Sequence, residues 1–241
     1  MKAKDKLMIA LDLDSKEKAI DIIQRLEADV EIFKVGLELY LASRGKVVDY
    51  LQEKGKKVFL DLKFMDIPNT VAGAAREAAK MGVFMFNLHV PGGKQMMVSA
   101  REAVEQVAAG GQKKPLIVAV TVLTSLDQND LLQLGITQDI KELVISRAKL
   151  AKEAGLDGIV ASPREAAQIR SVCGSDFVSV CPGIRPTWAA TGDQKRIMTP
   201  KEAINQGATY LVVGRPIIAA ADPAEAARKV IKEMEEDLNA N

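Results

Sequence analysis

The stretch VFLDLKFMDIPNT, residues 58–70, contains an apolar run that ends abruptly in charge. Asp61, Lys63 and Asp66 follow that run closely, and Pro68 then turns the chain. Charged side chains are rarely buried at the end of a core strand unless they are paired. The pattern therefore predicts a buried strand whose carboxyl end carries paired charges.

Outward from this stretch, the chain alternates between two kinds of segment. Short apolar or β-branched runs predict strands over residues 7–12, 32–36, 57–63, 84–90, 116–123, 158–162, 177–182 and 210–214. Segments with helical spacing lie between them. Several begin at an N-cap residue (Ser15, Asn69) or end just before a glycine (Gly82, Gly155).

Eight strands alternating with helices over 241 residues predict an α/β fold, a (β/α)8 TIM barrel that forms a single domain over residues 1–241. We find no linker or shift in composition that would mark a domain boundary. A doubly wound open sheet is the alternative. Its usual glycine-rich turn is absent after the first strand, where the sequence reads LDLDSKEK, and this favours the barrel.

Composition excludes several classes of protein. The chain is 48% hydrophobic and 27% charged with a formal net charge of +1, so neither nucleic acid nor an anionic membrane is an expected partner. No apolar stretch approaches the roughly 18 residues of a membrane span, and the amino terminus reaches Asp12 too soon for a signal peptide. Cys173 and Cys181 have no disulfide or metal-ligand spacing, which predicts reduced thiols and a cytoplasmic location.

The barrel changes how the charged residues are interpreted. Side chains alternate along a strand, so Asp61 and Lys63 are expected inside with Phe59, and Asp12 and Lys34 inside from the two preceding strands. The residues expected to face the helices are Leu7, Ile9, Leu11, Phe33, Val35, Val58, Leu60 and Leu62. Each charge alone could simply reach water. Four charges of alternating sign at one mouth favour a paired, partly desolvated site.

The last two strands suggest a second feature of the site. The seventh runs into CPGIRP, residues 181–186, and the eighth into VVGRPI, residues 212–217. Barrels commonly hold phosphate in the loops after these strands. Arg215 adds a planar, permanently charged fork beside Gly214. We therefore expect a phosphate site here.

These motifs together resemble one family. DLKFMDIPNT, residues 61–70, is similar to the D-x-K-x-x-D-I-P-N-T signature of orotidine 5′-phosphate decarboxylases, most closely of the bacterial branch. Further segments that resemble the family in the same order are ALDLD (10–14), FKVGLEL (33–39), VTVLTS (120–125), PGIRP (182–186) and VVGRPI (212–217). The resemblance spans nearly the whole chain.

The resemblance implies a carboxy-lyase that converts orotidine 5′-monophosphate to UMP, the last step of de novo pyrimidine biosynthesis, with no metal and no organic cofactor. In that reaction Lys63 would stabilise and then protonate the carbanion at C6. Asp61 would lie near the substrate carboxylate, and Lys34 and Asp66 would complete an alternating chain of charges. Asp12 and Lys34 would also bind the ribose hydroxyls.

The resemblance also assigns the other contacts. Gln194, Gly214 and Arg215 would bind phosphate, with Arg185 in the same loop, and Thr124 would contact the pyrimidine. The loop from Arg185 to about residue 198 is long and contains glycine, which is consistent with a lid that closes over the substrate. Its TGDQKR segment could instead be a plain solvated loop.

The family implies a homodimer with shared sites, in which Asp66 and Thr70 serve the partner's site. The same DIPNT segment is also typical of an ordinary helix start, and both interpretations can hold. His89 is expected to face inward with Asn87 and to hydrogen-bond near the site rather than to take part in catalysis.

Two other functions stay open. A magnesium-dependent decarboxylase or aldolase of keto-sugar phosphates, from the same suprafamily, shares the D-x-K-x-x-D core, although the continuation IPNT speaks against it. A non-catalytic phosphate-binding barrel would be expected to lose part of the charge network, yet every member is present.

Overall fold

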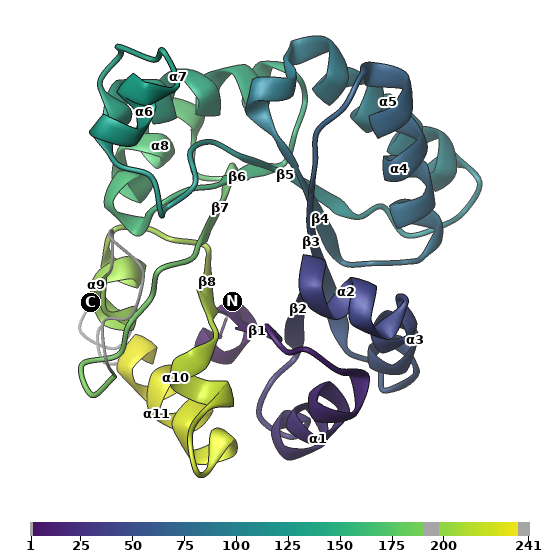
Figure 1. The fold of residues 1–241 in the computed structure, drawn as a ribbon, viewed down its shortest axis with the longest axis vertical. Coiled ribbons are helices and arrows are strands. Elements are labelled where there is room, and N and C mark those ends of the chain that lie inside the picture. Colours follow the sequence, from purple (N-terminus) through teal and green to yellow (C-terminus); the bar gives the residue numbers. More distant parts are fainter. Residues whose placement is uncertain (1, 190–197, 236–241) are drawn as a thin grey trace.

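Eight parallel strands close into a barrel, and each pairs with its neighbours in chain order (Figure 1). The computed structural model describes residues 2–189 and 198–235. The strands are β1 (Leu7–Ala10), β2 (Ile32–Gly36), β3 (Lys57–Phe64), β4 (Met85–His89), β5 (Leu116–Val120), β6 (Gly158–Val160), β7 (Val178–Cys181) and β8 (Tyr210–Val213). The predicted (β/α)8 barrel is therefore confirmed.

Helices surround the strands on the outside (Figure 1). The α-helices are α1 (Lys16–Leu26), α2 (Leu37–Ser43), α3 (Lys46–Glu53), α4 (Pro68–Lys80), α5 (Lys94–Ala109), α6 (Gln128–Gln133), α7 (Ile140–Glu153), α8 (Ala166–Cys173), α9 (Pro200–Asn205), α10 (Arg215–Ile218) and α11 (Pro223–Glu235). Short 3-10 helices are η1 (Ala3–Lys6), η2 (Val90–Gly92) and η3 (Pro163–Glu165). In residues 2–189 and 198–235, none of these helices has the length and apolar character needed to cross a membrane.

The alternation of side chains produces two separate cores. The interior of the barrel is filled by Met8, Ala10, Ile32, Phe59, Met85, Val118, Val180, Tyr210 and Val212. The layer between strands and helices contains the residues expected there, Leu7, Ile9, Leu11, Phe33, Val35, Val58 and Leu60, with Leu62 packed against it. The inward and outward faces of the first three strands are thus as the sequence predicted.

The expected helix caps are only partly right. Ser15 caps α1 by accepting a hydrogen bond from the backbone of Lys18 at 3.3 Å. Asn69 does not cap α4, because the helix begins at Pro68 and its N-cap residue is Ile67. Proline suits this first position, where a missing N–H costs nothing. Gly82 and Gly155 both follow helix ends with positive φ, as predicted.

Strand ends differ from the expected ones by a few residues. β1 ends at Ala10 rather than residue 12, because the backbone N–H of Leu13 bonds the carbonyl of Leu11 at 3.0 Å and turns the chain there. β5 ends at Val120 rather than residue 123. Asp12 and Thr124 consequently lie in loops at the carboxyl-terminal mouth, where side chains can turn toward a ligand.

Barrel closure leaves no room for a side chain at Gly158. An added Cβ there would overlap the carbonyl oxygen of Val178 and lie 2.6 Å from its Cβ, and both belong to the paired strand β7.

Gly158→Ala should therefore lower the free energy of unfolding by about 1–3 kcal/mol, as measured by urea denaturation. The matched control is Gly73→Ala in α4, where an added Cβ meets no atom within 4 Å, and which should not be destabilising. Equal stability of both variants would contradict the close approach of β6 and β7.

Candidate active site

The carboxyl-terminal mouth of the barrel opens into a cavity of about 350 Å³, a size typical of small-molecule sites. Its lining includes Asp12, Lys34, Asp61, Lys63, Thr124, Arg185, Gly214 and Arg215, which are the sequence-predicted residues that the fold brings together. They come from both sides of the barrel: the acids and lysines lie in β2 and β3 or just after β1, and the arginines follow β7 and β8.

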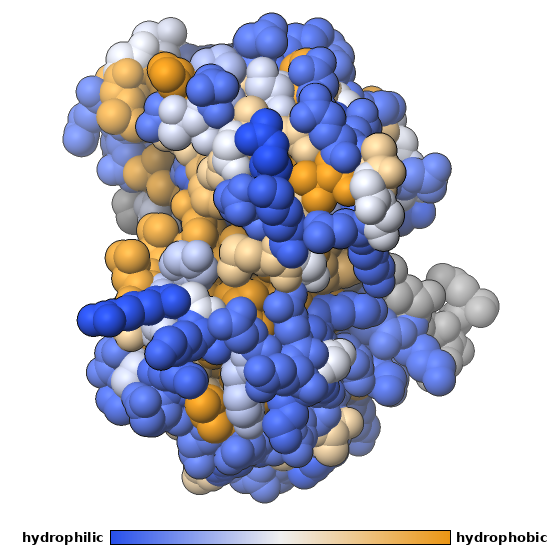
Figure 2. Space-filling model, turned by 90° about the vertical axis from the view of Figure 1, so that its right-hand side faces the viewer, coloured by the Kyte–Doolittle hydropathy of each residue, from blue (hydrophilic) through white to orange (hydrophobic). Residues whose placement is uncertain are grey.

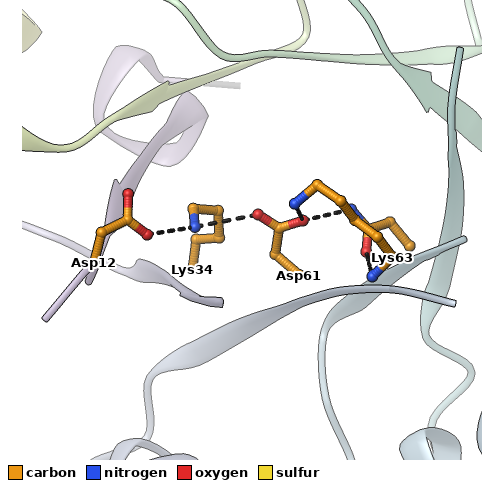
Figure 3. A network of polar contacts seen from close by, with 5 residues as sticks. Asp12, Lys34, Asp61 and Lys63 are labelled. Carbon is orange, nitrogen blue, oxygen red and sulfur yellow. Dashed lines mark hydrogen bonds and ion pairs between the residues drawn. The ribbon is translucent and has the colours of Figure 1, made fainter. Parts of the chain in front are cut away.

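A row of alternating charges lies along one side of this cavity (Figure 3). Lys34 Nζ lies 2.9 Å from Asp12 Oδ1 and 3.1 Å from Asp61 Oδ2, and Lys63 Nζ lies 2.6 Å from Asp61 Oδ1. Strand pairing places the segments that bear these four residues side by side, since β1 pairs with β2 and β2 pairs with β3. The two acids and two lysines make a chain that is formally neutral.

The centre of this row is buried. Lys34 and Asp61 are 7% and 8% exposed, whereas the Asp12 side chain is 58% exposed at the open end. Burial alone would raise the pKa of Asp61, but the ammonium groups of Lys34 and Lys63 outweigh it and hold that pKa below its ordinary value. Burial alone would lower the pKa of Lys34, but Asp61 and Asp12 outweigh it and hold that pKa above its ordinary value. Mutual pairing therefore keeps both buried groups charged.

Two glycines leave room for this row. A Cβ on Gly36 would lie 3.2 Å from Lys34 Nζ, and a Cβ on Gly214 would lie 3.3 Å from that of Ala10 and 3.7 Å from Asp12 Oδ2. The cavity wall thus follows the charged atoms closely at both positions.

The opposite side of the cavity brings two guanidinium groups together. Arg185 is 9% exposed, and its Nη1 donates to the carbonyl of Ile184 at 3.0 Å. Burial and the nearby positive charge of Arg215 both lower the pKa of Arg185. An anion bound between the two would offset this repulsion, which is the environment a phosphate group prefers. Thr124 lines the cavity after β5, between the two sides.

Asn87 is a site residue whose role the sequence did not reveal. Its side chain, fully buried in β4, donates from Nδ2 to Asp61 Oδ1 at 2.6 Å and accepts the backbone N–H of Lys63 at 2.8 Å. The hydrogen-bonding role expected of His89 was wrong, because among the described residues its side chain makes no hydrogen bond. Burial and the nearby cations Lys63 and Arg147 hold the pKa of His89 below its ordinary value.

Other predicted residues lie apart from the cavity. Asp66 and Thr70 are exposed in the single chain and do not line it, and Asp66 Oδ1 accepts the backbone N–H of Ile67 at 2.6 Å. Gln194 lies outside the described residues, as does most of the loop expected to close over the substrate. Within the described ranges, no group of three or more His, Cys, Asp or Glu side chains is arranged to hold a metal ion.

Solved structures with the same fold resemble this chain closely. Orotidine 5′-phosphate decarboxylase from Lactobacillus acidophilus is 38% identical, with a TM-score of 0.84 covering 95% of this chain and 99% of that one. An uncharacterised conserved protein from Geobacillus kaustophilus is 37% identical, with a TM-score of 0.82 over the same shares.

Curated sequences are closer still. Orotidine 5′-phosphate decarboxylase of Moorella thermoacetica is 51% identical over 237 residues, which cover 98% of this chain and 94% of the relative. The protein of the same name from a Nostoc species is 50% identical over 232 residues, which cover 95% and 97%. The model of the orotidine 5′-phosphate decarboxylase/HUMPS family matches residues 5–230. With a family match over nearly its whole length and bacterial relatives that share half of its residues, the chain belongs to the orotidine 5′-phosphate decarboxylase/HUMPS family.

Proposed function

We propose that this chain decarboxylates orotidine 5′-monophosphate to UMP, the last step of de novo pyrimidine biosynthesis, without a metal or organic cofactor. The observation that carries the proposal is the alternating row from Asp12 to Lys63 in the cavity, opposite two arginines. The family model also covers the HUMPS members, but the relatives that share half of the sequence are named orotidine 5′-phosphate decarboxylases. A cytoplasmic location fits the two free, buried cysteines.

The chemistry explains why a lysine is needed. When the bond between C6 and the carboxyl carbon breaks, its electron pair stays on C6 in the plane of the ring, where the π-system cannot delocalise it. A preformed positive charge beside C6 stabilises this pair as it develops. Lys63 supplies that charge, CO2 departs, and the Lys63 ammonium transfers a proton to C6 to complete UMP. Water returns the proton to the lysine.

Asp61 and Lys34 hold the lysine charged and in place. Asp61 Oδ1 lies 2.6 Å from Lys63 Nζ, and Lys34 neutralises the other carboxylate oxygen at 3.1 Å. A substrate carboxylate beside Asp61 would be repelled, and this repulsion disappears as CO2 leaves. Asp12, at the exposed end of the row, and Lys34 bind the ribose hydroxyls.

The far side of the cavity binds the rest of the substrate. Arg185 and Arg215 hold the phosphate together with the backbone at Gly214 and with Gln194, and Thr124 contacts the pyrimidine. Binding is therefore separated from the reacting carbon by the width of the cavity. Binding energy gained at the phosphate can be used to hold the substrate carboxylate close to Asp61.

The first test compares the intact protein with Lys63→Ala. Mixing the protein with orotidine 5′-monophosphate in the presence of EDTA should produce a falling substrate absorbance and UMP. Lys63→Ala should lower kcat by about a thousandfold or more, because it removes a charge that matters mainly in the transition state. The dissociation constant of UMP, measured by calorimetry, should stay within about threefold.

Lys57→Ala is the matched control, because Lys57 is exposed at the opposite end of the same strand and should leave kcat unchanged. No absorbance change with the intact protein would refute the decarboxylase. Activity that requires a metal ion removed by EDTA would point to the magnesium-dependent class. A Lys63→Ala variant with a tenth of normal kcat would refute the role of the lysine.

Arg215→Ala should affect binding more than chemistry. Because Arg215 would contact the phosphate, its loss should raise KM for orotidine 5′-monophosphate at least about tenfold. Steady-state kinetics with orotidine, which lacks the phosphate, should show little difference between the intact protein and the variant. An equal loss with both substrates would mean that Arg215 does not bind phosphate.

We further propose a homodimer in which Asp66 and Thr70 complete the partner's site. Both residues are exposed in the single chain, beside exposed apolar side chains. Met65, Ile67, Leu37 and Leu41 are 54–72% exposed, and exposed apolar side chains that gather in one patch commonly mark an interface. Figure 2 shows apolar residues gathered across the middle of the face that carries α2–α5. A two-fold axis at this surface would present each β3–α4 segment to the other subunit.

Subunit exchange tests this sharing directly. Lys63→Ala and Asp66→Asn homodimers should each be nearly inactive, since every site lacks one member. After the two are dissociated together and allowed to re-pair, about half of the dimers are mixed, and each has one intact site. Activity per subunit should recover to about a quarter of that of the unmodified protein. With exchange verified by a mass-tagged chain, an inactive mixture would show that Asp66 acts within its own chain.

A further inference from the structure

The pairing of β3 with β4 is interrupted at the charged row. Phe59 and Leu60 lie opposite Met85 and Phe86, but the next matched pair is Phe64 with Leu88. Residues 61–63 of β3 therefore lie opposite one residue of β4, Asn87. This bulge contains both Asp61 and Lys63, so an irregularity of the strand sets the direction of each charged side chain.

The backbone at the bulge is in an uncommon conformation. Lys63 has a φ of 53°, in the left-handed region that residues with a Cβ seldom occupy. Within the described chain only Arg44, at the end of α2, shares this feature among residues other than glycine. Such a conformation persists only where surrounding contacts hold it, and it commonly marks a functional position.

Both ends of the Asn87 amide contact this bulge. Its Oδ1 accepts the backbone N–H of Lys63 at 2.8 Å, and its Nδ2 donates to Asp61 Oδ1 at 2.6 Å. The same Asp61 oxygen accepts the Lys63 ammonium at 2.6 Å. One buried amide thus connects the backbone that carries the ammonium with the carboxylate that receives it.

Packing does not require an amide at this position. Asn87 is paired in register with Val118 and lies two residues after Met85 in β4. Both Val118 and Met85 belong to the apolar interior of the barrel. An apolar side chain would fill the space without the desolvation cost of a buried amide. The amide is accommodated because its two bonds are made, and both are made to the bulge.

We propose that Asn87 is a positioning residue for the decarboxylation. It fixes the left-handed backbone of Lys63 and the orientation of Asp61, so that the ammonium lies where negative charge develops on C6. This inference rests on the proposed function. Asn87 does not line the cavity, so it would not contact the substrate. It acts through Asp61 and Lys63.

The test uses Asn87→Ala, which removes both bonds, and Asn87→Asp, which keeps the shape and the acceptor but loses the donor to Asp61. Each should lower kcat by about a hundredfold or more, the cost expected of misplacing a catalytic group by about an ångström. The dissociation constant of UMP should stay within about threefold, since the phosphate and ribose contacts lie elsewhere. A crystal structure of Asn87→Ala should show Lys63 at negative φ with its ammonium away from Asp61.

Ser179→Ala is the matched control for loss of a buried polar side chain. Ser179 lies in β7 and accepts the backbone N–H of Thr209 at 3.1 Å, on the far side of the barrel, so its loss should leave kcat unchanged. If the intact protein does not decarboxylate orotidine 5′-monophosphate, the proposed function fails, whatever Asn87 does. If it does and both Asn87 variants keep kcat within threefold, the positioning role is wrong. If neither variant folds while Ser179→Ala does, Asn87 serves folding and the proposal is overturned.

Discussion

The buried carboxylate of Asp61 is the constraint on which the rest of the site depends. An unpaired charge with 8% exposure would be strongly destabilising, so this carboxylate requires partners from every neighbouring element. It receives Lys34 from β2, Lys63 from its own strand and Asn87 from β4. Those partners meet because β2, β3 and β4 are adjacent and parallel, with the register between β3 and β4 shifted at residues 61–63. The charged row therefore depends on the way these three strands are paired.

The division of charge across the cavity follows from the same constraint. The acids and lysines of the row cancel one another, so the positive potential that can attract an anionic ligand comes from Arg185 and Arg215 on the other side. A ligand with a phosphate at one end would consequently be oriented before its other end reaches Asp61. This separation lets binding and chemistry be altered independently, which a site with mixed charges would not allow.

Alternation along strands explains how much of this could be predicted from the sequence. Phe59 was expected inside the barrel, and Leu7 and Leu60 outside, because a period of two is a local property of any extended strand. The meeting of Asp12, Lys34, Asp61 and Lys63 also followed, since parallel strands bring their carboxyl ends to one mouth.

What the sequence did not reveal is where that period fails. The bulge at residues 61–63 and the positive φ of Lys63 depend on a bond to Asn87, which is 24 residues away in the sequence. No local pattern encodes such a partner, and Asn87 looks like any polar residue in a strand. His89 was singled out by its residue type, whereas burial and the nearby cations Lys63 and Arg147 lower its pKa. The cross-subunit roles of Asp66 and Thr70 stay predictions, because a single chain leaves both residues exposed.

The bulge also places local stability in conflict with chemistry. Glycine would adopt a φ of 53° without strain, so it would be the better residue for the backbone at position 63. It would also remove the ammonium and leave Asp61 with one cation fewer. Lys63 Nζ lies 2.6 Å from Asp61 Oδ1, so the fold itself orients the charge that the reaction would need. In the proposed reaction, an ammonium held in this way would need no reorganisation as charge develops at C6, and that advantage would offset the strain of a lysine where glycine would fit.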